Sequence, residues 1–449
     1  MIRHLLLVSC CLTLIQAGTS AVSAEQPNIV LILADDLGYG DLGCYGHLAA
    51  KTPHIDRLAK QGVRFTQHYA NGPECSPTRT ALLTGRYQQR VGGLECAIGT
   101  GNVGRYDDAI RLAENGDLGL PADQVVLPTA LKDAGYTCGI FGKWHLGYEP
   151  KFNPIKHGWN EFFGYLGGNV HYFNHRELSD LHVLYRGSKQ ATADGYMTHL
   201  ITDASIDFIE RHRDRPFFLF VSHESPHFPF QGPRDSDKLV NKENWTTPAA
   251  STYVAMLEDL DSEVGRLLAA LNKQGLADDT LVVFVSDNGG FAGAARMGSL
   301  RGAKGTTFEG GIRVPLIIRW PGQVSAGAEC SQVSATFDLT RSFLTLAGAE
   351  QAAKRSDGYD IIDHVVERRD DFSRTLFWRG RRDEQTWWAV RDGGAKYVRK
   401  ADGDEAEEWL FDLARDIGEE NNLLANKQAE ADRLKELLRA WETEVKPQR

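Results

Sequence analysis

Five short apolar runs recur along the N-terminal three quarters of the chain. The first, residues 27–33, reads Pro-Asn-Ile-Val-Leu-Ile-Leu and lacks the polar alternation of a half-exposed strand. A continuous run of this kind is typical of a strand buried on both faces of a parallel sheet. The later runs have the same character and lie at residues 136–141, 216–222, 280–286 and 314–318. The pattern predicts a large core sheet.

Helical patterns separate these runs. The clearest covers residues 253–271, where apolar side chains recur at spacings of three and four. These side chains are Tyr253, Met256, Leu257, Leu260, Val264, Leu267, Leu268 and Leu271. Strands that alternate with such helices predict an α/β fold, with a doubly wound, mixed and mostly parallel sheet.

The pattern changes after Gly348. A charged connection at residues 367–371 leads to shorter strand-like segments, and Asp392-Gly393-Gly394 has the composition of a tight turn between two of them. The segments lie at residues 375–378, 386–390, 395–398 and 409–413, and a closing amphipathic helix is built on Leu434, Leu437, Leu438 and Trp441. We therefore expect an α/β domain at residues 25–350 and a smaller α+β subdomain at residues 351–449, with a small antiparallel sheet and a terminal helix.

Residues 1–24 have the layout of a cleavable secretory signal peptide. A basic start precedes an apolar run from Leu5 to Ile15, and Val22-Ser23-Ala24 provides small residues for cleavage. The run is too short to span a bilayer, so we expect an exported protein (periplasmic, secreted or lumenal) without stable membrane insertion. Export permits disulfides, but the sequence assigns no pairs among Cys44, Cys96, Cys138 and Cys330.

Composition narrows the class of partner. Hydrophobic residues make up 42% of the chain and charged residues 24%, as in an ordinary globular protein. The formal net charge is -10 and no block of Lys and Arg is present, which argues against nucleic acid as a partner. An anionic small substrate would therefore need a local basic pocket.

Polar residues directly follow four of the predicted strands. In open α/β sheets, ligands bind outside the carboxyl ends of the strands, so these residues should converge. They are Asp35 and Asp36, Lys143 to His145, His223 to His227, and Asp287 with Asn288. The acidic pairs offer hard oxygen ligands, which suit Ca²⁺, with Mg²⁺ second, better than zinc. A single Asp-Asp pair is more often a solvated loop or a helix cap, but two acidic strand ends on one sheet favour a metal.

Cys75 precedes a segment of helical composition, residues 80–86. Pro77 suits the first turn of this helix and Ser76 lies near its cap, which places Cys75 at the helix N-terminus. Free backbone N–H groups favour an anion there, and Arg79, one turn on, adds a charge-assisted contact. Composition alone would make Cys75 an ordinary buried thiol.

These residues resemble the type I sulfatase family of the alkaline phosphatase-like superfamily. Its signature is Cys-x-Pro-x-Arg followed, after three residues, by Leu-Thr-Gly-Arg, and Cys75, Pro77, Arg79 and residues 83–86 fill every defined position. Five further segments follow the family's pattern in its order, at residues 35–40, 52–58, 142–147, 286–289 and 304–311. The resemblance covers almost the whole chain after residue 24.

The resemblance implies a sulfuric ester hydrolase in which a formylglycine-generating maturation enzyme has oxidised Cys75 to Cα-formylglycine (3-oxoalanine). The hydrated aldehyde is the nucleophile. A serine would form a sulfate ester that hydrolyses slowly, whereas the hydrate can expel sulfate by re-forming the aldehyde. The resemblance also implies one Ca²⁺ that bridges the diol and a sulfate oxygen. Its ligands would be Asp35, Asp36, Asp287, Asn288 and the modified Cys75.

Catalytic roles follow from the same resemblance. Arg79 and Lys143 would support the diol and the anion. His145 would take a proton when sulfate is eliminated, and Asp287 is the expected base for the attacking hydroxyl. Each of these residues lies in one of the matching segments.

Two further residues are expected to bind the sulfate group itself. These are Lys304 and His227, and one of them should protonate the leaving alcohol. His227 is preferred to His223 because family members carry the sulfate-binding histidine at the second of these positions.

Two other functions remain open. A phosphonate monoester or phosphodiester hydrolase of the same superfamily can share formylglycine, although Cys75 and Asn288 disfavour the simpler phosphatases with two metals. A catalytically silent carbohydrate-binding relative would be expected to have lost members of the constellation, yet every expected position is filled.

The substrate is expected to be a sulfated small molecule or glycan. Loops at residues 92–122, 165–200 and 228–250 should form the rim of the pocket. The middle loop carries candidate sugar contacts, for which an ordinary polar surface loop is the alternative: Asn169, His171, Tyr172, His175 and Arg176. No apolar membrane hairpin is visible, which favours sulfated glycans over steroids. The sugar, the sulfate position and exo or endo action stay open.

Overall fold

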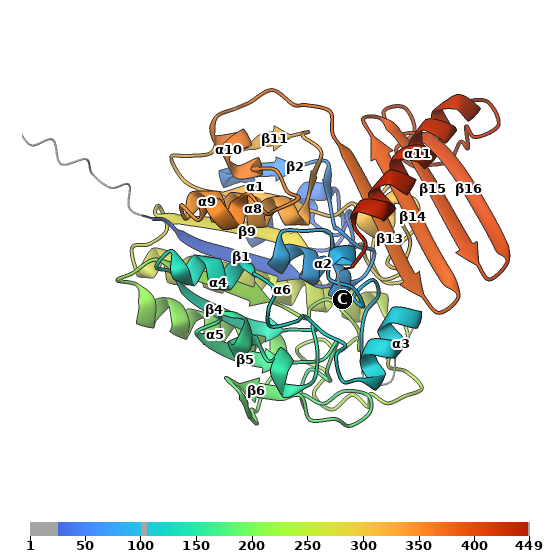
Figure 1. Ribbon diagram of the computed structural model, residues 1–449. Coiled ribbons are helices and arrows are strands. Elements are labelled where there is room, and N and C mark those ends of the chain that lie inside the picture. The colour runs from blue at the N-terminus through green and yellow to red at the C-terminus, as the bar shows by residue number, and fades with distance from the viewer. Residues whose placement is uncertain (1–25, 100–105, 448–449) are drawn as a thin grey trace, which may run out of the picture.

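The computed structural model describes residues 26–99 and 106–447, so the predicted signal peptide lies outside the described residues. A ten-stranded sheet crosses the molecule, in the order β11-β2-β10-β9-β1-β8-β4-β5-β6-β7 (Figure 1). Its strands are β1 (Asn28–Ala34), β2 (Val63–Phe65), β4 (Thr137–Lys143), β5 (Glu161–Tyr165), β6 (Leu184–Arg186), β7 (Lys189–Gln190), β8 (Phe217–Ser222), β9 (Thr280–Ser286), β10 (Leu316–Arg319) and β11 (Ala328–Cys330). A two-stranded sheet pairs β3 (His68–Tyr69) with β12 (Ser334–Ala335).

The centre of the large sheet is parallel. Strands β9, β1, β8, β4 and β5 all run in one direction, which confirms the prediction of a mostly parallel sheet. The fifth apolar run differs from the others, because β10 pairs antiparallel with β9. Residues 287–315 turn the chain back at the carboxyl end of β9 without a crossover, so the next strand runs in reverse. A strand buried on both faces is apolar whichever way it runs, so the apolar run could not indicate that β10 is antiparallel to β9.

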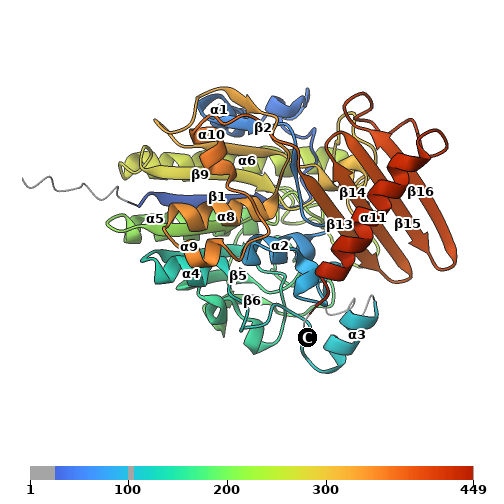
Figure 2. The same ribbon diagram turned by 45° about the horizontal axis from the view of Figure 1, so that its top comes forward.

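Two hydrophobic cores lie on opposite faces of the sheet. Successive side chains of β1 alternate between them, with Ile29 and Leu31 on one face and Val30 and Ile32 on the other. One face is covered by α1 (Pro53–Gln61), α5 (Met197–His212) and α6 (Ala250–Lys273). The opposite face is covered by α2 (Cys75–Thr84), α4 (Leu127–Asp133), α8 (Thr336–Leu346), α9 (Glu350–Ala353) and α10 (Ile361–Val366) (Figure 2). The helix α3 (Asp107–Glu114) adds Ala109 and Leu112 to the same core but lies beyond the sheet face.

A second, four-stranded sheet follows the large one in the chain. It is antiparallel throughout, and α11 (Gln428–Glu444) packs across it over a third core (Figure 1). Its strands are β13 (Thr375–Arg382), β14 (Gln385–Asp392), β15 (Ala395–Asp402) and β16 (Glu405–Asp412). They extend beyond the segments expected from the sequence because their ends carry charged side chains, which an apolar pattern does not register. The turn at residues 392–394 joins β14 to β15 as predicted.

A buried group of charges connects the second sheet to the segment between β9 and β10. Lys396 on β15 is fully buried and contacts Glu309 Oε1 at 2.8 Å and Glu419 Oε1 at 2.9 Å. Glu309 begins α7 (Glu309–Ile312), only five positions after Lys304. Burial alone would raise the pKa of Glu309, but the cations of Lys396 and Arg313 outweigh burial and lower it. The position of α7 therefore depends on this ion pair.

We expect Lys396→Met to destabilise the protein by about 3–5 kcal/mol at pH 7, because two carboxylates lose a buried cation. Since the pKa of Glu309 is lowered to about 2 in the folded state, its stabilising contribution is present above its unfolded pKa and is lost as the pH falls from about 4.5 to about 2. The difference between the variant and the parent should therefore shrink on acidification through this range. Urea unfolding at pH 7 and pH 3 measures it. Lys400→Met, on the same strand but in a partly exposed pair with Asp402, is the control and should cost about 0–1 kcal/mol. An equal loss in both variants would contradict the prediction.

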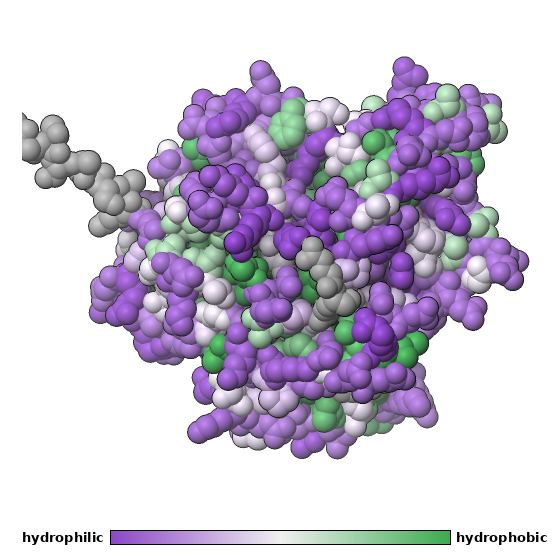
Figure 3. Space-filling view, viewed as in Figure 1, coloured by the Kyte–Doolittle hydropathy of each residue, from purple (hydrophilic) through white to green (hydrophobic). Residues whose placement is uncertain are grey.

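Figure 3 shows a face dominated by hydrophilic residues, with apolar ones scattered among them. Within residues 26–99 and 106–447, no helix combines the length and apolar character needed to cross a membrane. Cys44, Cys138 and Cys330, whose pairing the sequence left open, carry thiols without a disulfide.

Candidate active site

The N-terminus of α2 carries Cys75 to the carboxyl edge of the sheet. Glu74 precedes the helix in an extended conformation, and Pro77 occupies the first turn. The helix ends at Thr84, two residues earlier than predicted, because Gly85 adopts the left-handed conformation at φ 67°. Ser76 lies near the N-cap as predicted, and its hydroxyl donates to the His145 carbonyl at 2.9 Å.

The Cys75 side chain is completely buried among charged groups. Its sulfur lies 3.3 Å from Asp35 Oδ1 and 3.6 Å from Lys304 Nζ. Burial, and then the neighbouring Asp35 carboxylate, raise the pKa of the Cys75 thiol well above its ordinary value. The unmodified thiol is therefore protonated at neutral pH and is a poor nucleophile.

Arg79 links four segments of the chain. Its guanidinium donates to Asp287 Oδ2 at 3.2 Å, to the Ser222 hydroxyl at 2.6 Å and to the Lys143 carbonyl at 3.0 Å. The Lys143 ammonium in turn pairs with Asp35 Oδ2. Sequence reasoning missed Ser222, whose only signal was its place as the last residue of an apolar run. These contacts fix the ends of β4, β8 and β9 relative to the helix.

The acidic residues form a site that suits a hard cation. Asp287 Oδ1 accepts from the Asp36 backbone N–H at 3.3 Å, and Asn288 Nδ2 donates to Asp36 Oδ1 at 2.8 Å. Burial raises the pKa of both the Asp36 and the Asp287 carboxyl groups. Asn288 Oδ1 is buried and lacks a hydrogen-bond partner among the described residues. Grouped carboxylates that resist ionisation, with a free amide oxygen beside them, fit a divalent cation with oxygen ligands.

A neighbouring cluster of ligand atoms overlaps this acidic site. Asp35, Asp36, Cys75 and His227 each bring one such atom within 4.8 Å of the others. Three of these four residues were predicted metal ligands, and the fourth was predicted to bind sulfate. The predicted metal and sulfate groups are therefore adjacent.

Lys304 and His227 lie beside the acidic residues, with Lys304 between Asp36 and His227. Lys304 Nζ lies 2.8 Å from Asp36 Oδ2 and 3.0 Å from His227 Nε2, and 11% of its side chain is exposed. Burial, and then Lys304, lower the pKa of His227, so its ring is neutral at neutral pH. His223 lies outside the group; it is buried, and within the described chain neither of its ring nitrogens has a partner.

His145 contacts the helix from the end of β4. It adopts a left-handed conformation at φ 60°, and its Nε2 is hydrogen-bonded to the Ile98 carbonyl. Burial, and then Lys143, lower its pKa well below the ordinary value. Its Nδ1 is buried without a partner among the described residues. The ring is therefore a neutral imidazole that can accept a proton.

The predicted sugar-contact residues lie in a loop with many internal hydrogen bonds. Tyr172 is buried, and its hydroxyl donates to the His227 carbonyl at 3.0 Å, which joins this loop to the active site. The other four are held as follows: Asn169 by Trp245, His171 by the backbone of Phe173 and Asn174, His175 by the Gly195 carbonyl, and Arg176 by Asp180. Their contact with substrate stays a prediction.

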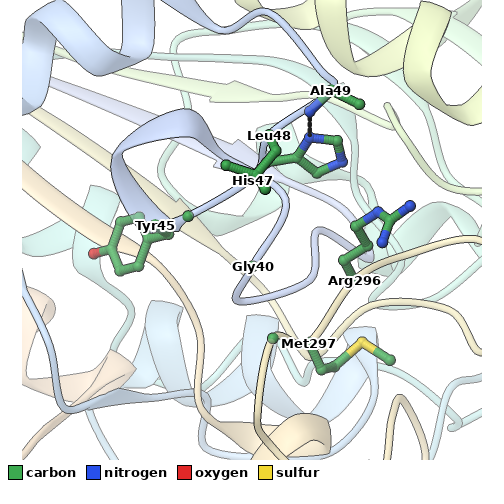
Figure 4. Close-up of a pocket in the computed structure, with 9 residues that line it drawn as sticks. Gly40, Tyr45, His47, Leu48, Ala49, Arg296 and Met297 are labelled. Atoms are coloured by element: carbon green, nitrogen blue, oxygen red, sulfur yellow. Dashed lines mark hydrogen bonds between the residues drawn. The ribbon is translucent and has the colours of Figure 1, made fainter.

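A hollow of about 570 Å³ lies between residues 40–49 and residues 296–298 (Figure 4). Tyr45, His47, Arg296 and Met297 help to line it, and His47 Nδ1 accepts from the Ala49 backbone at 3.0 Å. None of the predicted site residues lines this hollow. The central site residues are buried against one another and leave little open space.

Comparison with known proteins supports one family. The family model described as Sulfatase matches residues 27–349, and that described as N-sulphoglucosamine sulphohydrolase, C-terminal, matches residues 303–444. The N-acetylgalactosamine-6-sulfatase of Sus scrofa is 35% identical over 400 residues, covering 84% of this chain and 72% of the relative. Arylsulfatase A of Bos taurus is 33% identical over 465 residues, covering 91% and 85%. The crystal structure of Ps i-CgsB in complex with k-i-k-neocarrahexaose superposes with a TM-score of 0.80 at 30% identity, covering 94% of each chain.

Proposed function

This chain belongs to the type I sulfatase family of the alkaline phosphatase-like superfamily and is a sulfuric ester hydrolase, and we propose that it releases sulfate from a sulfated carbohydrate. The reaction would use Cys75 as Cα-formylglycine together with a bound Ca²⁺. The observation that carries the proposal is the position of the Cys75 sulfur, completely buried between Asp35 and Lys304. Similarity to an N-acetylgalactosamine-6-sulfatase and to a protein in complex with an oligosaccharide supports the carbohydrate.

The environment of Cys75 supports the proposed modification. Burial keeps the thiol protonated, so it cannot attack sulfur as a thiolate. A hydrated aldehyde at the same position supplies a hydroxyl nucleophile beside the Asp35 carboxylate. Because Cys75 has no exposed surface, a maturation enzyme must reach it before the chain folds.

The acidic group would hold the calcium ion through Asp35, Asp36, Asp287 and Asn288. When bound, the ion neutralises these carboxylates and polarises a sulfate oxygen. Arg79 holds Asp287 in place through a buried ion pair. Lys143 does the same for Asp35. Both cations also support negative charge on the nucleophile and the sulfate group.

The remaining residues transfer protons and bind the sulfate group. Burial would lower the pKa of Lys304, but Asp36 outweighs burial and raises it, so the ammonium stays charged against the sulfate group. The pair formed by Lys304 and His227 supplies the proton to the leaving alcohol. Asp287 is the base for the attacking hydroxyl, and the neutral ring of His145 accepts the proton that is released as sulfate leaves.

A comparison of two aryl esters tests the proposal. We expect the purified, matured enzyme to hydrolyse an aryl sulfate at least 10²-fold faster, in kcat/KM, than the corresponding aryl phosphate diester, an energy difference of roughly 3 kcal/mol. Faster turnover of the diester or of a phosphonate monoester would favour the alternative activity. Sulfate release from defined sulfated mono- and oligosaccharides would then identify the sugar and the sulfate position.

A further inference from the structure

Three residues outside the active site bring metal-ligand atoms together. Cys330 ends β11, His364 lies on α10, and Asp371 lies on the connection that leads to β13. One ligand atom from each lies within 4.8 Å of the other two. The Cys330 and His364 side chains are buried, whereas the Asp371 side chain is 44% exposed. The cluster therefore has an apolar interior and one side open to water.

We propose that Cys330, His364 and Asp371 form a second metal site, which binds Zn²⁺ and ties the connection between the two sheets to the edge of the large sheet. The proposal does not depend on the activity proposed for Cys75.

The donor set matches zinc in chemistry, and the separation of its histidine and aspartate atoms is compatible with a shared ion. Thiolate, imidazole and carboxylate are all common zinc ligands, whereas a thiolate does not suit Ca²⁺ or Mg²⁺. Tetrahedral coordination with bond lengths of about 2.0–2.3 Å places neighbouring ligand atoms about 3.3–3.6 Å apart. His364 Nε2 lies 3.2 Å from Asp371 Oδ1, close to that separation. The exposed side of Asp371 leaves room for water as the fourth ligand.

The imidazole of His364 faces the Asp371 carboxylate through Nε2, which lies 3.2 Å from Asp371 Oδ1. Its other nitrogen, Nδ1, is buried and has no hydrogen-bond partner in the part of the chain that the structure describes. Coordination through Nε2 would leave the ring proton on Nδ1. Only 6% of Cys330 is exposed, so a substrate could not reach the sulfur. This disfavours a Cys-His-Asp nucleophile.

The surrounding residues already hold the three ligands in position. The Ser331 hydroxyl donates to Asp371 Oδ2, which orients the carboxylate. Gln332 Oε1 accepts from the Phe372 backbone N–H at 2.8 Å, and this bond fixes the two chain segments beside each other. The rings of Tyr359 and Phe372 pack edge-on against the His364 imidazole. A metal would therefore bind with little ordering of the chain.

Cobalt is a spectroscopic probe for this site. The full chain, kept in excess Ca²⁺, is titrated with Co²⁺ and then with Zn²⁺. We expect one equivalent of Co²⁺ to produce thiolate-to-cobalt charge-transfer absorption, which Zn²⁺ then displaces, and we expect Zn²⁺ to raise the Tm. Cys330→Ser and His364→Asn should each abolish the absorption. Cys138→Ser, which removes another buried thiol, should retain it.

Further variants keep the result clear. Asp36→Asn alters the active site and should leave the cobalt absorption unchanged, which separates the two sites.

Turnover of an aryl sulfate shows that the Cys330 and His364 variants have folded. If they do not fold, Asp371→Asn serves instead, because its partly exposed side chain can be changed with little loss of packing; its Zn²⁺ affinity should fall about tenfold or more. The proposal is wrong if the parent protein gives no thiolate-to-cobalt absorption, or if Asp371→Asn binds Zn²⁺ as tightly as the parent.

Discussion

Cys75→Ala is expected to lower sulfate release from an aryl sulfate by roughly 10⁴–10⁶-fold in kcat, the range seen when a catalytic nucleophile is removed. No other group can take over, because the nearest carboxylates are engaged by cations: Lys143 pairs with Asp35, and Lys304 pairs with Asp36. Steady-state kinetics on purified protein measures the effect, with retained Tm as evidence of folding.

Two comparisons make the Cys75 result specific. Cys138→Ala removes a buried thiol from β4 and should leave kcat within about threefold of the parent, because it changes packing alone. Mass spectrometry of the parent peptide that contains Cys75 should find an aldehyde or its hydrate. Unmodified protein should be inactive. Parent-like turnover by Cys75→Ala would show that the nucleophile lies elsewhere.

Asp36→Asn is expected to lower kcat/KM by roughly 10²–10⁴-fold and to raise the Ca²⁺ concentration needed for half-maximal activity. The Asp36 carboxylate contacts Lys304 at 2.7 Å and accepts from Asn288, so the change removes a proposed metal ligand and leaves a buried ammonium without its charged partner. The expected range corresponds to a loss of about 3–5 kcal/mol of transition-state stabilisation.

A calcium titration after chelation measures this second effect. The parent enzyme should lose activity in the chelator and recover it with Ca²⁺, whereas the variant should recover only in part and at higher Ca²⁺. Asp108→Asn, on the exposed surface of α3, removes one negative charge without touching the site and should behave as the parent. Full activity of Asp36→Asn in the presence of chelator would rule out this residue as a metal ligand.

The sequence predicted the central strands well because burial on both faces leaves a local signature. The apolar run at residues 280–286 coincides with β9, and the helical spacing at residues 253–271 lies within α6. The sequence pattern was a weaker guide where charged residues lie inside a strand or where a backbone conformation ends a helix. The predicted strands of the second sheet were therefore too short. The predicted helix at Cys75 ran past Gly85, whose left-handed conformation ends α2.

The site residues were predicted by motif, but their contacts were not. Motif and strand-end reasoning identified Cys75, Asp36 and Lys304 as members of one site. No spacing along the chain indicated that the Arg79 guanidinium would donate to Ser222, or that Asn288 Oδ1 would be left without a partner. The five candidate sugar contacts have hydrogen bonds within and around their loop that sequence reasoning did not foresee.

The sequence by itself determined the central strands, the longest helix and the motifs that place the chain among the sulfatases. Periodicity and motif are properties of neighbouring residues, so a linear chain displays them. Only the tertiary structure decided that β10 runs antiparallel, that Lys304 reaches the Cys75 sulfur across 229 positions of sequence, and that Cys330, His364 and Asp371 meet. Such distances depend on how remote segments pack at one edge of the sheet, and no local pattern encodes that packing.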